Sequence, residues 1–233
     1  MPEALHLAGV GAGYGETYVL EAIDLSLAAG ETLSVIGRNG VGKSTLLETI
    51  MGHTTLHAGE IRLGERRIER APAHARALAG LGYVPQEREI FPSLTVRENL
   101  EIGARPGPWT QARVFELFPN LRERLHHHGT QLSGGEQQML AVARALVTNP
   151  SVLLMDEPTE GLAPVIVQAL AQVLSKLRSA GGFSILLVEQ NSRVALDFSA
   201  RTVVMDKGRI VYDGASERLR ADPELLARLI AAE

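Results

Sequence analysis

Gly37-Arg38-Asn39-Gly40-Val41-Gly42-Lys43-Ser44 is the stretch that decides the fold of this 233-residue chain. The short apolar run 33–36 before it predicts a buried strand, and the residues from Lys43 to about Met51 predict a helix. Glycines let successive backbone N–H groups converge, and the start of a helix adds partial positive charge. The stretch therefore predicts a loop that binds phosphate groups between a strand and a helix.

Two side chains of this loop carry the expected chemistry. Lys43 is one of only three lysines in the chain, and a lysine at this spacing reaches the β- and γ-phosphates of a nucleotide. Ser44 offers a hydroxyl oxygen to Mg²⁺. The alternative is a glycine turn that binds no ligand, and the full motif in its strand–loop–helix setting favours the phosphate loop.

A second signal lies far downstream, where the apolar run 152–155 ends in two adjacent carboxylates, Asp156 and Glu157. If this strand lies beside the strand of the phosphate loop, Asp156 can hold Mg²⁺ and Glu157 can polarise the attacking water. Acidic residues also end strands as solvated caps, so the pair by itself does not indicate a catalytic site. Together with the phosphate loop it does.

Composition restricts the remaining possibilities. Apolar residues make up 45% of the chain and charged residues 21%, which is typical of a globular protein. A net charge of -4 provides no broad basic field, so nucleic acid is not expected as a partner. No apolar run is long enough for a membrane helix, and the chain has no cysteine. We expect a protein without a membrane span, located in the cytoplasm.

The order of patterns predicts an α/β fold. Short β segments open the chain, the first from Leu5 to Gly9, and they indicate antiparallel β structure. Three buried runs at 152–155, 184–188 and 202–205 alternate with helices, which indicates a mainly parallel sheet with helices on both faces. The segment 95–149 is helical in pattern. We expect one domain over residues 1–233: a core with an antiparallel β subdomain, from about 1 to 94 and from 150 to 233, and an inserted helical subdomain between them.

A third motif, Leu132-Ser133-Gly134-Gly135-Glu136-Gln137-Gln138, opens a predicted helix that runs to about Val147. Ser133 and Glu136 fit a capping box, which needs no glycines. Ser-Gly-Gly ahead of a helix also offers a second anion site, built from backbone N–H groups, a hydroxyl and the helix dipole.

This motif resembles the LSGGQ signature of ABC (ATP-binding cassette) ATPases, and the resemblance covers nearly the whole chain in the right order. It implies ATP and Mg²⁺ as ligands and a head-to-tail dimer, in which each ATP is held by one phosphate loop and by the other chain's signature. It also implies that Tyr14 stacks on adenine and that Gln86 approaches Mg²⁺ and the attacking water. The residues expected to contact nucleotide are Tyr14, Gly37, Arg38, Asn39, Gly40, Val41, Gly42, Lys43, Ser44 and Thr45, with Ser133, Gly134, Gly135 and Glu136 acting in trans; Ser44, Gln86 and Asp156 are the expected metal ligands.

Within the family, Leu187-Val188-Glu189-Gln190-Asn191 and Gly161-Leu162-Ala163-Pro164 resemble the LivF type of branched-chain amino acid importer ATPase. The segments 37–42 and 84–92 are also similar to urea and amide importers. The resemblance implies two transmembrane permease subunits, a second ATPase subunit that is a paralogue or a copy, and indirectly a periplasmic or extracellular solute-binding protein. The chain would then lie on the inner face of the cell membrane.

Two positions depart from the common family pattern. Gln190 stands where most ABC ATPases have a histidine that contacts the γ-phosphate, and a glutamine amide can donate a hydrogen bond but does not titrate near neutral pH. Ala163 stands where many relatives have an aspartate that helps the two sites communicate. Both departures recur in the importer subgroup, and we expect Gln190, Lys43, Gln86 and Glu157 to serve catalysis.

Two other classes remain open at this point. A soluble ABC protein that acts in DNA repair or on ribosomes usually has a long coiled-coil insertion or tandem cassettes, and neither pattern is present. A P-loop kinase or GTPase lacks the signature and would carry a substrate lid or an Asn-Lys-x-Asp motif. The sequence favours an importer ATPase over both.

Overall fold

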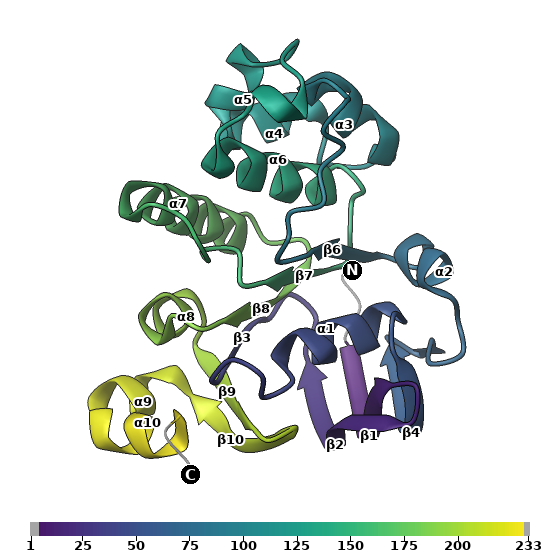
Figure 1. Cartoon of the computed structure of the whole chain (residues 1–233), viewed down its shortest axis with the longest axis vertical. Helices are drawn as coiled ribbons and strands as arrows, with labels where there is room; N and C mark the ends of the chain where they lie inside the picture. Colours follow the sequence, from purple (N-terminus) through teal and green to yellow (C-terminus); the bar gives the residue numbers. More distant parts are fainter. Residues whose placement is uncertain (1–4, 231–233) are drawn as a thin grey trace.

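The computed structural model describes residues 5–230, which form two sheets and a group of helices at one end (Figure 1). The first sheet has the order β2-β1-β4-β5, and the second has the order β10-β9-β3-β8-β7-β6. The strands are β1 Leu5–Tyr14, β2 Thr17–Leu27, β3 Thr32–Ile36, β4 Thr55–Leu63, β5 Arg66–Arg67, β6 Leu81–Val84, β7 Val152–Asp156, β8 Ser184–Glu189, β9 Arg201–Asp206 and β10 Arg209–Ala215.

The six-stranded sheet is parallel from β9 to β6, and only the edge strand β10 runs antiparallel. In β7 every residue is buried, as expected of a strand with both faces covered. Leu153 and Met155 pack with the helical group and α7 Pro164–Ala180, whereas Val152 and Leu154 pack with α1 Lys43–Met51 and the other sheet. The predicted α/β core with helices on both faces is confirmed.

The first sheet is antiparallel, as predicted, but its strands are longer than the sequence indicated. We expected β1 to end at Gly9, and it continues to Tyr14. Register shifts between Leu7 and Val10 and again around Ala12 let the strand pass through three glycines without losing its pairing to β2 and β4. The extension places Tyr14 at the edge of the phosphate loop.

The segment between β6 and β7 is helical, and its elements stand together at the top of Figure 1. They are α3 Val96–Gly103, α4 Gln111–Leu117, α5 Pro119–Glu123, a 3-10 turn Gly129–Gln131 and α6 Gly134–Leu146. Trp109 ties this group to the sheet, because its ring meets Phe183 edge to face with centroids 5.7 Å apart. The division into subdomains at about residues 95 and 150 stays a prediction.

The remaining helices are α2 Ala73–Leu78, α8 Ser192–Phe198, α9 Ser216–Ala221 and α10 Pro223–Ile230. Together with β9, β10 and α8, the last two helices enclose a small apolar cluster around Leu196 and Leu219. Over residues 5–230, none of the helices has both the length and the apolar character needed to cross a membrane.

Candidate functional site

The phosphate loop connects β3 to α1 and meets the helix at Gly42. This residue is the N-cap, with φ 103° in the left-handed region, and no side chain caps the helix. The first N–H groups of any helix lack partners within that helix. The start of α1 therefore offers backbone donors and a dipole to an anion, as the sequence predicts.

Lys43 lies under this loop. Its Nζ donates to the carbonyl oxygens of Gly37 and Arg38, both at 2.9 Å, and lies 3.0 Å from Glu157 Oε1. The side chains of Lys43 and Glu157 are 3% and 6% exposed, so the ion pair is shielded from water. The structure thus brings together the two residues for which we predicted phosphate binding and water activation, although they are far apart in the sequence.

Asp156 ends β7 beside the start of α1, where Ser44 Oγ donates to its Oδ1 at 3.1 Å. Burial raises the pKa of Asp156 to about 6, and the charges of Glu157 and Glu48 act in the same direction. A hydroxyl oxygen beside a buried carboxylate fits Mg²⁺, which favours oxygen ligands and retains waters. Within residues 5–230, no group of three or more His, Cys, Asp or Glu side chains is placed to hold a metal ion, so phosphate oxygens and water would supply the other ligands.

Lys43, Ser44 and Glu157 line one cavity of about 390 Å³, whereas Asp156 is not part of its lining. Its lining consists of Tyr14, Val19, Asn39, Gly40, Gly42, Lys43, Ser44, Thr45, Gln86 and Glu157. Tyr14 is 49% exposed, and its hydroxyl donates to Glu48 Oε2 at 2.5 Å, with Thr45 Oγ1 3.4 Å away. The half-exposed side chain thus lines the cavity while its hydroxyl is fixed to Glu48 of α1.

Gln86 follows β6 and reaches the same cavity. Its side-chain amide donates to the carboxylate of Glu160, in the turn that follows Glu157. This hydrogen bond links the segment that leads from β6 into the helical group with the turn that follows β7. The expected approach of Gln86 to Mg²⁺ and water stays a prediction.

Gln190 lies beside Glu157 but lines a second cavity, also of about 390 Å³, together with Thr159, Glu160 and Glu189. Glu157 lines both cavities and so stands between the phosphate loop and the segment of Gln190. Gln190 is exposed, which leaves its amide free to donate to a ligand.

The signature motif lies outside these cavities, at the start of α6. Ser133 and Glu136 form the predicted capping box, in which Ser133 Oγ accepts from the Glu136 N–H at 3.3 Å and both Ser133 N and Oγ donate to the Glu136 carboxylate at 2.8 Å. Ser133 and Gly134 are exposed, whereas Gly135 is buried against Ile166 of α7. The motif does not touch the chain's own phosphate loop cavity.

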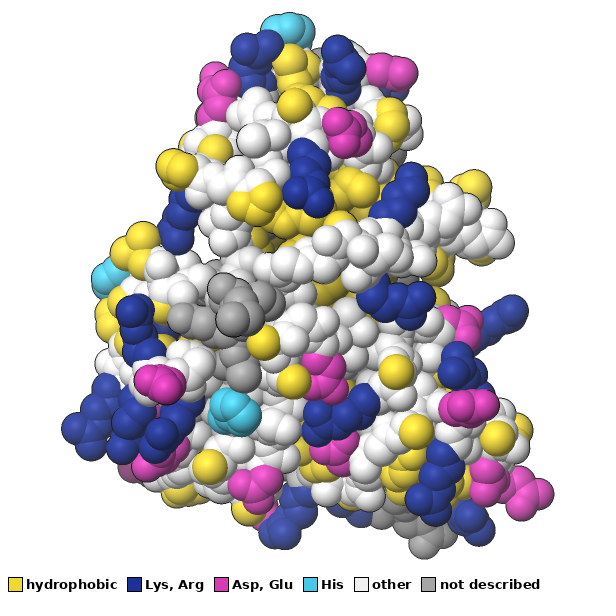
Figure 2. All heavy atoms as spheres, turned by 180° about the vertical axis from the view of Figure 1, so that it is seen from behind, with side chains coloured by type: hydrophobic (Ala, Val, Ile, Leu, Met, Phe, Trp, Pro, Cys, Tyr) yellow, Lys and Arg dark blue, Asp and Glu magenta, His cyan; other side chains and the backbone are white. Residues whose placement is uncertain are grey.

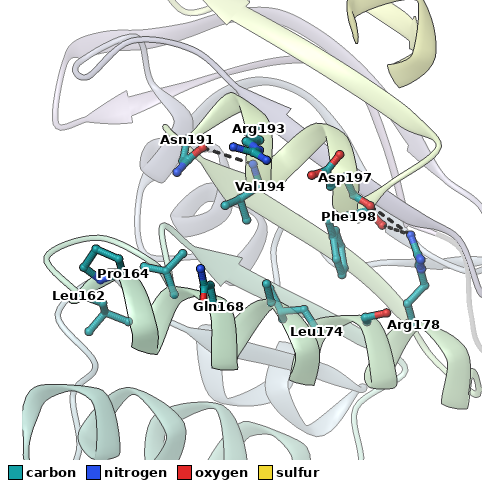
Figure 3. Close-up of a pocket in the computed structure, with 13 residues that line it drawn as sticks. Leu162, Pro164, Gln168, Leu174, Arg178, Asn191, Arg193, Val194, Asp197 and Phe198 are labelled. Atoms are coloured by element: carbon teal, nitrogen blue, oxygen red, sulfur yellow. Dashed lines mark hydrogen bonds between the residues drawn. The ribbon is translucent and has the colours of Figure 1, made fainter.

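A larger groove of about 640 Å³ runs between α7 and α8 (Figure 3). Arg178 closes one end by donating to the carbonyl oxygens of Asp197 and Phe198 at 3.3 and 2.7 Å. None of the predicted site residues lines this groove.

Sequence reasoning missed the acidic residues that support the site. Glu160 holds Gln86, Glu48 holds Tyr14, and Glu189 is a buried carboxylate at the end of β8. Glu189 carries the same signal that identified Asp156, namely an apolar strand that ends in an acidic side chain. That signal could have found it.

A phosphate loop and an acidic strand end that share one cavity define a nucleotide-hydrolysing enzyme of the P-loop class. A family model described as "ABC transporter" matches residues 20–160, and the chain belongs to this family of transporter ATP-binding domains, which are ATPases.

Relatives with assigned names lie close in sequence. The chain is 38% identical over 220 residues to the high-affinity branched-chain amino acid transport ATP-binding protein BraG of Pseudomonas aeruginosa, with 91% of this chain and 93% of that protein covered. It is 37% identical to the probable branched-chain amino acid transport ATP-binding protein LivF of Archaeoglobus fulgidus, with 92% and 93% covered. Relatives at 31% and 34% identity are named for lipopolysaccharide export and aliphatic sulfonate import.

A solved structure matches the fold over its length. The dimeric structure of a post-hydrolysis state of the ATP-binding cassette MJ0796, bound to ADP and Pi, superposes with a TM-score of 0.79 at 27% identity, covering 91% of this chain and 98% of that one. The predicted family and fold class are both confirmed.

Proposed function

We propose that this chain binds and hydrolyses MgATP as one half of a cassette dimer, and so drives import of branched-chain or other hydrophobic amino acids through separate permease subunits. The observation that carries the hydrolytic part is the single cavity lined by Lys43, Ser44 and Glu157. The amino acid part is supported by the relatives named for branched-chain amino acid transport, at 37% and 38% identity.

The site residues identified from the sequence have the following proposed roles. Lys43 and the N–H groups at the start of α1 bind the phosphates, and Tyr14 stacks on the adenine. Ser44, Asp156 and Gln86 hold Mg²⁺, which when bound would neutralise phosphate charge. Glu157 orients and deprotonates the attacking water, and Gln190 donates a hydrogen bond to phosphate from the other side.

The signature motif acts on the other subunit's nucleotide. Its exposed Ser133 and Gly134 stand at the start of a 13-residue helix, away from the chain's own cavity. A second cassette, either a paralogue or another copy, would bring its phosphate loop to this helix end. The dimeric MJ0796 structure supports such an arrangement within the family.

The permeases would dock near the helical group, with the chain on the cytoplasmic face of the membrane. Two large apolar side chains are exposed there, Phe91 after β6 and Ile102 on α3, at 43% and 61%. On the face shown in Figure 2, apolar side chains also gather directly below the helical group, whereas charged side chains cover much of the lower part of the molecule. A solute-binding protein would deliver cargo on the opposite side of the membrane.

Two variants test the hydrolytic proposal. Lys43→Ala should abolish measurable MgATP binding in an equilibrium titration, whereas Lys176→Ala, which removes an exposed lysine of α7, should bind as the parent does. Glu157→Gln should bind MgATP, turn over slowly and accumulate as a dimer in size-exclusion chromatography with ATP. Unchanged affinity and hydrolysis in Lys43→Ala would refute the phosphate site, and normal turnover in Glu157→Gln would refute the assigned base.

A further inference from the structure

Glu189 is a buried carboxylate for which the proposed hydrolytic machinery has no use. It ends β8 with 1% of its side chain exposed. In the sheet, β8 lies between β3 and β7, so Glu189 stands opposite Ile36, just before the phosphate loop, and one residue beyond the pair Val188–Asp156. A carboxylate at this edge of the sheet is surrounded by the segments that carry the reaction.

Donors from two segments converge on this side chain. The backbone N–H of Thr159 donates to Glu189 Oε1 at 3.1 Å. Hydrogen bonds from the Thr159 hydroxyl and from the backbone N–H of Asn191 also favour the ionised form. The carboxylate therefore connects the turn after β7 to the segment that holds Gln190.

The turn held in this way is the one that carries Glu157. Its backbone has φ 43° at Glu157, a left-handed conformation that a non-glycine residue keeps only where its surroundings fix it. Glu157 N donates to Val188 O at 2.9 Å, and Glu160 N donates to Glu157 O at 3.0 Å. Thr159 lies within this turn, and its N–H bond to Glu189 is a third hydrogen bond that fixes the turn.

We propose that Glu189 is a positioning residue for ATP hydrolysis: its carboxylate holds the turn 157–160 so that Glu157 faces the phosphate loop and Glu160 can hold Gln86. The inference rests on the proposed ATPase reaction and assigns to it a residue that does not touch the nucleotide. Glu189 acts through the Thr159 backbone, and its loss should lower the rate of the chemical step more than the affinity for MgATP.

Burial first, and the neighbouring carboxylates to a smaller extent, make the ionised form of Glu189 costly. Glu157 and Glu160 line the same cavity, while Lys43 offsets Glu157 from the side of α1 and Asp156 lies at the end of β7. The nearest residues from β3, α7 and the start of α8 are the uncharged Ile36, Val167 and Asn191, and Arg193 of α8 lines the neighbouring groove.

Burial, with a smaller contribution from the charge of Glu157, raises the pKa of Glu189 to about 7. A carboxyl whose pKa is raised in the folded protein reduces stability when it is ionised. The negative charge at this position is therefore not explained by stability. Protonation would also turn one acceptor oxygen into a donor that faces N–H groups, so the hold on the turn should weaken as the pH falls through about 7.

The test compares Glu189→Gln with the parent and with Glu217→Gln, which makes the same chemical change on the exposed first turn of α9. Hydrolysis at saturating MgATP, MgATP affinity and thermal stability are measured from pH 6 to 8.5. We expect Glu189→Gln to lower kcat about tenfold at pH 8, as for loss of one hydrogen bond to a charged group, and to leave the MgATP Kd within about twofold. Its stability at pH 8 should equal or exceed that of the parent.

The pH profile adds a readout that a merely structural role would not change. The parent's kcat should decline as the pH falls through about 7, and Glu189→Gln should lack this decline. Parent-like kcat in Glu189→Gln, or a loss of activity that matches a loss of folded protein, would overturn the proposal. A parent chain that neither binds nor hydrolyses MgATP would instead overturn the proposed function, and this inference with it.

Discussion

The ion pair between Lys43 and Glu157 makes a prediction about the protein without nucleotide. Its atoms lie 3.0 Å apart, and both side chains are at least 94% buried, since they are 3% and 6% exposed. Lys43→Met would leave the Glu157 carboxylate buried without this cation and close to Asp156, which is also acidic. Removing one partner of a buried pair costs about 3 to 5 kcal/mol, because the remaining charge stays desolvated.

A double-mutant cycle measures this pairing. Lys43→Met should lower the free energy of unfolding by about 3 kcal/mol and Glu157→Gln alone by about 1 kcal/mol, whereas the double variant should lower it by only about 1 kcal/mol, a coupling of roughly 3 kcal/mol. Urea unfolding without nucleotide or Mg²⁺ can be followed by the fluorescence of Trp109, the only tryptophan and 4% exposed. Lys176→Met serves as the exposed control. Additive effects of the two substitutions would refute the reasoning.

Three further predictions concern the rest of the site. Tyr14→Ala should weaken MgATP binding about tenfold in a titration while Tyr14→Phe stays within about twofold, since the proposed contact with adenine is made by the ring and not by the hydroxyl; equal losses in both would contradict stacking. Gly135→Ala should destabilise the fold by about 1 to 3 kcal/mol, because a Cβ there would lie 2.8 Å from Ile166 Cγ2, and adding Ile166→Ala should recover part of the loss in thermal unfolding. Burial raises the pKa of Asp156 to about 6, so its ionised form opposes folding. The unfolding free energy of the nucleotide-free protein should therefore rise as the pH falls from about 8 to about 5, and Asp156→Asn should reduce this dependence on pH. A pH dependence in Asp156→Asn identical to that of the parent would contradict the assignment.

The parts of the site that were predictable from sequence are those that depend only on short-range sequence patterns. The phosphate loop depends on glycine spacing before a helix, and α1 begins at Lys43 and ends at Met51 as predicted. The capping box of Ser133 and Glu136 is likewise a relation over four residues. These features need no knowledge of which strands are neighbours.

The supporting contacts depend on strand order, which sequence patterns do not specify. Glu189 meets Thr159 only because β8 lies next to β7, and Gln86 meets Glu160 only because β7 lies next to β6. The pairing of Lys43 with Glu157 also needs β7 close to the start of α1. The sequence patterns identified Lys43, Gln86 and Glu157 as candidates for chemistry, but not their partners Thr159, Glu160 and Glu189.

The length of β1 was mispredicted for a different reason. The predicted segment ends at Gly9, and glycines at positions 9, 11 and 13 leave no clear alternation of apolar side chains beyond that point. In the fold they accompany irregular pairing, and Gly13 lies where an added Cβ would come within 1.9 Å of Thr17 O. Gly13 thus reflects the close approach of a neighbouring strand, whereas Gly9 has φ 57° and open space around it, and neither ends the strand.

The segments that form the site are far apart in the sequence, and this separation has a consequence for the order in which the protein folds. Ser44 and Asp156 are 112 residues apart, and β8 must also insert between β3 and β7 before the end of β7 is fixed. Contacts between such remote segments form late, since closing long loops costs entropy before the contacts compensate. Capture of a fluorescent ATP analogue during refolding should therefore lag behind the recovery of helical signal, and it would serve as a sensor of completed assembly.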